Sequence, residues 1–131
     1  MLAPMSYTIC KLREIEDLAP KHGFGEVQEA RFPREALEAQ QTGLAYHVLR
    51  PGRRQGFAHR HAEAEEIYVV LAGDGRVKLD DEVVTLETMD AIRVAPAVTR
   101  AFEAGSGGLE LLAFGPRHEG DGEIIQDFWA E

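Results

Sequence analysis

The sequence predicts an all-β protein, folded as a single antiparallel barrel or sandwich. From Leu44 onward, short β-prone runs alternate with clusters of Gly, Pro and Asp at close, even intervals, a spacing typical of antiparallel sandwiches and barrels. The length of 131 residues is that of one domain, and 44% of the residues are hydrophobic. That is enough apolar material to bury a core without metal or disulfide crosslinks.

Residues 1–43 are predicted to form an N-terminal extension with one or two strands, which belongs either to the barrel or to a dimer interface. Two runs carry the strand prediction: residues 7–12 are β-prone, and residues 27–32 alternate apolar and polar side chains before a proline. Two other segments permit short helical turns, residues 14–19 and residues 34–41.

Residues 44–114 are predicted to form the barrel core. The glycines at 73–75 predict a hairpin turn, and those at 105–108 predict a break between strands, because glycine tolerates positive φ. Between these signals, the expected strands cover residues 44–49, 67–71, 76–79, 83–86, 91–94, 99–103 and 109–114.

Residues 115–131 form a C-terminal tail that is unusually apolar for a chain end. It carries Ile124, Ile125, Phe128 and Trp129. We expect such a tail to dock, either on its own barrel or on a partner.

Charge and hydropathy exclude several classes of partner. Lys and Arg total 14 against 23 Asp and Glu, a net charge of -9, which disfavours nucleic acids and anionic membranes. No run approaches the roughly 18 apolar residues of a membrane span, and no signal-peptide pattern is present, so we expect a cytoplasmic protein. Cys10 is the only cysteine, which leaves no intramolecular disulfide and no thiolate metal cluster.

The candidate site lies where one predicted strand turns into the next. Residues two apart on a strand share a face, with Cα atoms roughly 6.6 Å apart, so His59 and His61 project together. Glu66 opens the following strand, and a short turn can bring it to the same point. Two imidazoles and a carboxylate suit zinc, iron, manganese or nickel. Tyr68 shares the face of Glu66 and is expected beside the site.

The pattern His59-x-His61-x4-Glu66-x6-Gly73, preceded by Pro51-Gly52 and followed by the expected hairpin, resembles the first conserved motif of the cupin superfamily. A second motif of that superfamily falls at residues 89–100. The resemblance covers roughly residues 44–114. It implies a cupin-type barrel, a double-stranded β-helix or jelly roll, in which the two histidines and the glutamate are metal ligands. It also implies a homodimer.

The resemblance is incomplete at the fourth ligand, a histidine in metal-binding cupins. Arg100 and its neighbours occupy that place. An inward-pointing Arg100 could pair with Glu66 and replace the cation, or could anchor an anionic group of a substrate. His47, on a neighbouring strand, is an alternative fourth ligand.

Three functions are compatible with this pattern. The first is a metal-dependent enzyme, an oxygenase or isomerase, that acts on a small organic molecule bound near Tyr68 and Arg100. The second is a non-catalytic module that binds or senses a small molecule in the same cavity. The third is a metal-free barrel in which Arg100 pairs with Glu66.

Overall fold

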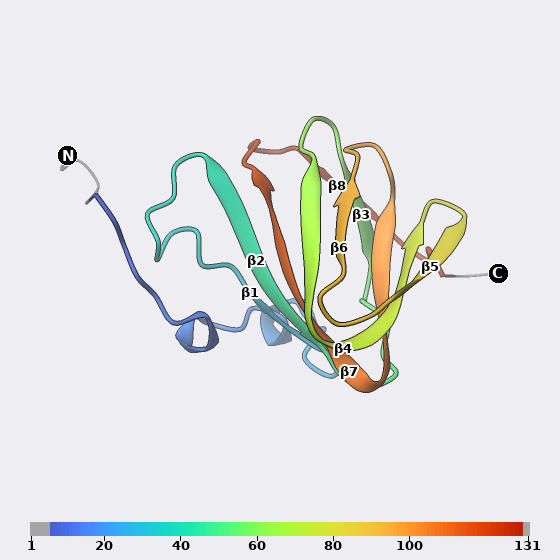
Figure 1. The fold of residues 1–131 in the computed structure, drawn as a ribbon. Helices are drawn as coiled ribbons and strands as arrows, with labels where there is room; N and C mark the ends of the chain where they lie inside the picture. Colours follow the sequence, from blue (N-terminus) through green and yellow to red (C-terminus); the bar gives the residue numbers. More distant parts are fainter. Residues whose placement is uncertain (1–5, 130–131) are drawn as a thin grey trace.

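The computed structural model describes residues 6–129, and its regular secondary structure is almost entirely β (Figure 1). Two 3-10 turns, η1 (Leu12–Glu14) and η2 (Pro20–His22), precede the sheet. The strands are β1 (Gln28–Arg31), β2 (Thr42–Leu49), β3 (Ala58–His61), β4 (Glu66–Leu79), β5 (Glu82–Leu86), β6 (Ala91–Val94), β7 (Arg100–Pro116) and β8 (Gly122–Ile125). The prediction of an all-β, antiparallel fold is confirmed.

Two long strands organise the sheet. The path β1-β2-β7-β3-β8 forms one side, while β4 pairs with β5, β6 and β7. All of these pairings are antiparallel. Because β7 pairs with β2, β3 and β4, the sheet curls around a single interior, as Figure 1 shows.

The glycines expected at turns lie inside β4 and β7 instead, so the predicted hairpin at 73–75 and the predicted break at 105–108 are wrong. The two strands run on through register shifts at this point. A Cβ atom on Gly73 would lie 2.1 Å from the carbonyl oxygen of Gly108, and one on Gly75 would lie 2.1 Å from that of Glu103. Glycine is therefore required for close approach of two backbones at a bulge rather than for a chain reversal.

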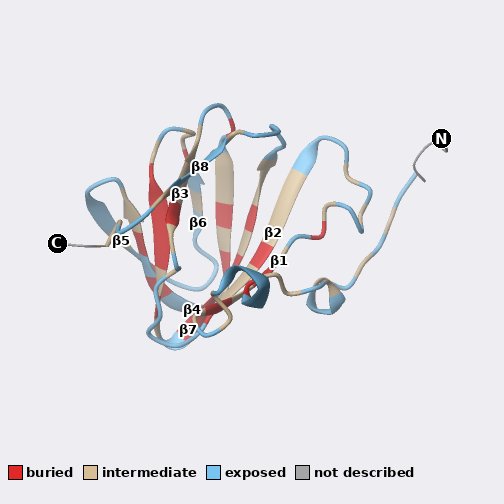
Figure 2. Ribbon diagram, turned by 180° about the vertical axis from the view of Figure 1, so that it is seen from behind, coloured by how far each residue is buried: buried red, intermediate tan, exposed pale blue. Residues whose placement is uncertain are grey.

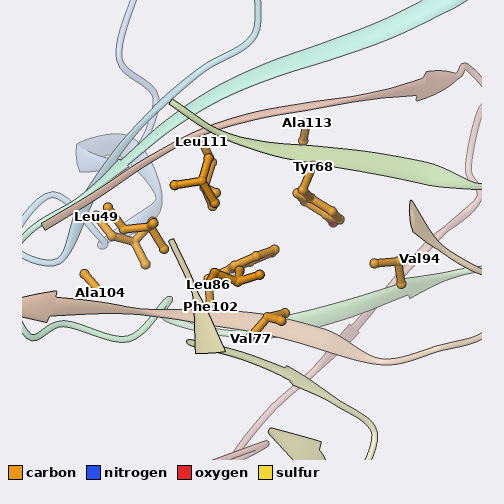
Figure 3. Close-up of a cluster of buried hydrophobic side chains, with 11 residues drawn as sticks. Leu49, Tyr68, Val77, Leu86, Val94, Phe102, Ala104, Leu111 and Ala113 are labelled. Atoms are coloured by element: carbon orange, nitrogen blue, oxygen red, sulfur yellow. The ribbon is translucent and has the colours of Figure 1, made fainter. Parts of the chain in front are cut away.

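The core fills the interior of the curled sheet (Figure 3). Figure 2 shows that buried residues gather on the central strands. The ring of Tyr68 packs against Phe102 with centroids 4.7 Å apart. Burying each large apolar side chain stabilises the fold by about 1.5–3 kcal/mol. The most buried members of the cluster are Leu49, Val70, Val77, Phe102, Leu109 and Leu111.

The N-terminal segment is less regular than its sequence predicts. Residues 7–12 form no strand, and residues 34–41 form turns rather than a helix. The outer edge of β1 instead contacts the segment around Asp17, through a bridge between Asp17 and Arg31. The Oδ1 atom of Asp17 accepts hydrogen bonds from the backbone N–H of Ala19 and Ala30, at 3.0 and 2.9 Å. The described residues contain no helix with the length and hydropathy to cross a membrane.

The C-terminal tail docks on its own barrel. Strand β8 pairs with β3 along its whole length. Beyond it, the Lys78 ammonium donates to the carbonyl oxygen of Phe128 at 2.5 Å and lies 4.5 Å from the centre of its ring. The Arg54 guanidinium lies 4.6 Å from the centre of the Trp129 ring. The tail is thus held by the pairing of β8 with β3 and, at Phe128 and Trp129, by two cations of the barrel.

Candidate metal centre

Three side chains converge on one point between β3 and β4. The Nε2 atoms of His59 and His61 lie 3.1 and 3.0 Å from the same oxygen, Oε1 of Glu66. The two imidazole rings stand edge to face, with centroids 5.1 Å apart. Candidate ligand atoms of the three residues all lie within 4.8 Å of one another. These are the three residues that the sequence pattern places together.

The backbone explains this convergence. Alternation along β3 directs His59 and His61 to one face, while Arg60 faces away and pairs with Glu123 at 2.8 Å. The backbone N–H of His61 donates to the carbonyl oxygen of Pro96 at 2.8 Å. Glu66 begins β4, so the short β3–β4 loop delivers its carboxylate to the two rings.

Tyr68 orients the Glu66 carboxylate through a hydrogen bond. Its hydroxyl donates to Oε1 of Glu66 at 2.7 Å and lies 3.5 Å from Nε2 of His59. Burial, together with the nearby negative charge of Glu66, raises the pKa of Tyr68 well above its ordinary value. The phenol therefore stays protonated and acts as a hydrogen-bond donor.

Glu66 is held in its ionised form. Burial by itself would raise its pKa, but hydrogen bonds from His59 and Tyr68 and the charges of the two imidazoles outweigh it, and the pKa falls to about 2. A carboxylate accepting several hydrogen bonds keeps its charge. Glu66 is thus ready to bind a cation at neutral pH.

The three residues fit a divalent metal ion. Two ligands at right angles around an ion, with bonds of about 2.1 Å, are about 3 Å apart, which matches the separations of 3.0 and 3.1 Å around Oε1 of Glu66. Nitrogen and oxygen donors in this combination suit zinc, iron, manganese and nickel. Three protein ligands also leave coordination positions for water or substrate.

Arg100 lies behind this cluster. Its Nη2 atom is 3.9 Å from Oε1 of Glu66, and its side chain is fully buried. The guanidinium donates to the carbonyl oxygens of Pro96 and Ala95, both at 3.4 Å. Nε of Arg100 has no hydrogen-bond partner within residues 6–129. Arg100 does not line the cavity described below, so its placement does not support direct contact with a substrate.

His47 lies outside the three-residue group. Its Nδ1 atom is 3.3 Å from Nε2 of Gln28, and its ring meets Phe32 edge to face. Burial lowers the pKa of His47 to about 4, with a smaller contribution from the charge of His59. His47 is therefore a neutral wall residue rather than a fourth ligand of the cluster.

A cavity of about 550 Å³ opens onto the cluster. Its wall is mainly apolar, and residues of the N-terminal extension, the barrel strands and the C-terminal tail contribute to it. Of residues 6–129, Glu66 is the one acidic side chain that lines the cavity, and no Lys or Arg of that range lines it. The lining residues are Leu18, Ala19, His22, Phe24, Gln28, Ala30, Phe32, Ala45, His47, Gln55, Gly56, Phe57, His59, His61, Glu66, Tyr68, Ala113, Ile124 and Gln126.

Asp121 belongs to the site although the sequence pattern did not indicate it. Its Oδ2 atom lies 3.4 Å from Nδ1 of His61, and its side chain is almost fully buried. An acidic residue between Gly120 and Gly122, about sixty positions from the motif, carries no signal of that contact. Only the pairing of β8 with β3 places it there.

Fold and cluster together define a small single-domain β-barrel with a candidate metal site facing a cavity. The sequence profile described as "Cupin domain" matches residues 45–114, more than half of the chain. The chain therefore belongs to the cupin family. No curated protein matches the sequence.

Several solved structures share the fold. A cupin protein from Bacteroides fragilis aligns with a TM-score of 0.69 and 22% identity, over 89% of each chain. KdgF from Halomonas sp. aligns with a TM-score of 0.64 and 19% identity, over 88% of this chain and 97% of that one. A salicylate 1,2-dioxygenase from Pseudaminobacter salicylatoxidans gives 0.63 and 18%, over 82% of this chain but only 34% of the dioxygenase.

Proposed function

We propose that the protein is a metal-dependent enzyme in which His59, His61 and Glu66 hold a divalent zinc, iron, manganese or nickel ion. The observation that supports it best is the approach of both Nε2 atoms to one carboxylate oxygen, at 3.1 and 3.0 Å. Imidazole and carboxylate donors leave such an ion with open positions. The fold shared with a salicylate 1,2-dioxygenase adds support for an oxygenase.

The bound ion would supply Lewis-acid or oxygen-activating chemistry to an oxygenase or isomerase reaction. The residues of the chain orient the proposed ligands and exclude water. Tyr68 fixes the Glu66 carboxylate through its hydroxyl, at 2.7 Å. The apolar wall keeps bulk water from a bound substrate and orients it toward the cluster.

The cavity favours a neutral and largely apolar substrate. In the described part of the chain, no Lys or Arg lines the wall to receive an anionic group. Aromatic rings from Phe24, Phe32 and Phe57 line it instead, and they suit a planar apolar molecule. The Gln28–His47 pair offers a polar contact for one neutral hydrogen-bonding group.

A second candidate is a metal-free binding module. The buried Arg100 cation, 3.9 Å from Oε1 of Glu66, supports it, because a guanidinium can balance the carboxylate that a metal would otherwise neutralise. In this case the same cavity binds or senses a small molecule without turning it over.

Metal analysis separates the two candidates. Protein purified without an affinity tag, stripped by a chelator and reloaded with each of the four ions, is expected to retain close to one ion per chain after desalting. His61→Ala should abolish retention. His118→Ala is the matched control, since His118 is half-exposed and pairs with Glu63 at 3.5 Å. Wild-type protein that retains none of the four ions would favour the metal-free module.

We also propose that the protein is a homodimer. The described N-terminal segment presents Tyr7 at 72% and Ile9 at 85% exposure, and apolar side chains this open favour a partner surface. Size-exclusion chromatography with light scattering should give twice the mass of one chain. Replacing both residues by serine should give the monomer mass, whereas a wild-type monomer would contradict the proposal.

A further inference from the structure

Asp121 touches the site without belonging to the ligand group. It precedes β8, which pairs with β3 so that Gly122 stands opposite His61. A Cβ atom on Gly122 would lie 3.9 Å from Cε1 of His61, so the tail passes directly against the imidazole. The C-terminal segment therefore forms one wall of the cluster.

The Asp121 carboxylate holds the loop that joins two candidate ligands. Its Oδ1 atom accepts hydrogen bonds from the backbone N–H groups of Ala62 and Glu63, at 2.9 and 2.8 Å. Its Oδ2 atom accepts one from Ala64 at 2.9 Å. Three consecutive N–H groups on one carboxylate fix the course of the chain between β3 and β4.

The same carboxylate faces the back of His61. Nδ1 of His61 is buried and has no hydrogen-bond partner within residues 6–129, and Oδ2 of Asp121 lies 3.4 Å away. An ionised carboxylate can only accept, so it favours a proton on Nδ1. In the metal-free protein, Oε1 of Glu66 lies 3.0 Å from Nε2 of His61 and favours a proton there as well. Metal binding requires Nε2 without a proton, and with an ion in that place the remaining proton would sit on Nδ1, facing Asp121.

We propose that Asp121 is a positioning residue of the metal centre, which fixes the orientation and the tautomer of His61 and the loop from His61 to Glu66. This inference rests on the proposed metal site. Carboxylates in this position generally tune metal affinity by ten- to a hundredfold. Asp121 and β8 thus complete a site whose proposed ligands lie on β3 and β4.

Asp121→Asn is the informative variant. Its amide oxygen can still accept from Ala62 and Glu63. An amide nitrogen in the place of Oδ2 cannot accept from Ala64, and it would donate to Nδ1 of His61 and favour the tautomer protonated on Nε2. Zinc affinity, measured by competition with a chromophoric chelator, is expected to fall about ten- to a hundredfold. Asp127→Asn, at an exposed position of the same tail, should leave affinity unchanged.

Two further measurements distinguish a role of Asp121 in orienting His61 from a role in folding stability alone. The urea midpoint of each metal-free variant reports stability, and a long-range ¹H–¹⁵N spectrum of the zinc-loaded wild type reports which His61 nitrogen carries the proton. We expect Nδ1–H. A His61 bound through Nδ1, or an Asn variant that loses stability but keeps zinc affinity, would overturn the role of Asp121 alone. Wild-type protein that binds no zinc, iron, manganese or nickel would overturn the metal site and this role together.

Discussion

The buried guanidinium of Arg100 and the carboxylate of Glu66 lie 3.9 Å apart, measured from Nη2 to Oε1. That same oxygen is the point on which His59 and His61 converge. One carboxylate oxygen therefore faces both a permanent cation and the proposed metal position. Since like charges repel across a poorly solvated site, Arg100 should weaken metal binding while it stabilises the metal-free protein.

Arg100→Met is expected to raise metal affinity by roughly tenfold or more, because it removes a positive charge next to the ion. Isothermal titration of chelator-treated protein with zinc checks this. The matched control is Arg60→Met, which removes the arginine that faces away from the cluster and pairs with Glu123. Unchanged or weaker zinc binding by the Arg100 variant would contradict the proposed charge competition.

Tyr68→Phe should weaken zinc binding by roughly tenfold, because Glu66 loses the hydroxyl donor at 2.7 Å that orients it. The ring still packs on Phe102, so unfolding free energy should fall by only about 1.5–3 kcal/mol. Urea denaturation and chelator competition measure the two effects. Tyr46→Phe, whose hydroxyl bonds Glu110 outside the cluster, should leave zinc affinity unaltered, and an equal loss there would refute a specific role for Tyr68.

His47 should make the protein less stable in acid. Its pKa is lowered from 6.5 to about 4 in the folded state, so between these values the unfolded chain binds a proton that the folded chain does not. Stability therefore rises with pH across this window, by up to about 3 kcal/mol, and the contribution is flat above it. Denaturation at pH 7 and pH 4.5 should show a smaller difference in His47→Asn, which keeps an acceptor near Gln28. An identical difference in both proteins would argue against this assignment.

The apolar wall predicts which small molecules bind. Zinc-loaded protein should bind 1-naphthol, a planar fluorescent dye that is neutral at pH 7 and whose hydroxyl can reach the ion, and should not bind glucose 6-phosphate. Ala45→Phe, which fills space in the wall, should abolish dye binding and leave zinc affinity unchanged. Tight binding of glucose 6-phosphate would contradict the proposed preference of the cavity for neutral, apolar molecules.

The sequence predicted the candidate ligands because their geometry is local. Two residues two positions apart on one strand share a face whatever lies around them, and Glu66 follows after a short loop, so His59, His61 and Glu66 meet as expected. The family resemblance supplied the barrel in the same way, through motifs within residues 44–114.

Other features depended on distant parts of the chain. Glycine at a turn and glycine at a bulge give the same sequence pattern. The sequence therefore could not predict that the residues before and after Gly73 belong to one strand, β4. The contact of Asp121 with His61 arises only when β8 pairs with β3. Arg100 likewise stands opposite His59 only because β7 pairs with β3.

Anomalous X-ray diffraction from crystals of the metal-loaded protein, recorded on either side of the absorption edge of the loaded ion, tests the metal site most directly. The proposed site predicts one strong anomalous peak bonded to Nε2 of His59, Nε2 of His61 and a carboxylate oxygen of Glu66. A map without that peak, in which the Arg100 guanidinium forms a direct hydrogen bond to Glu66, would contradict it.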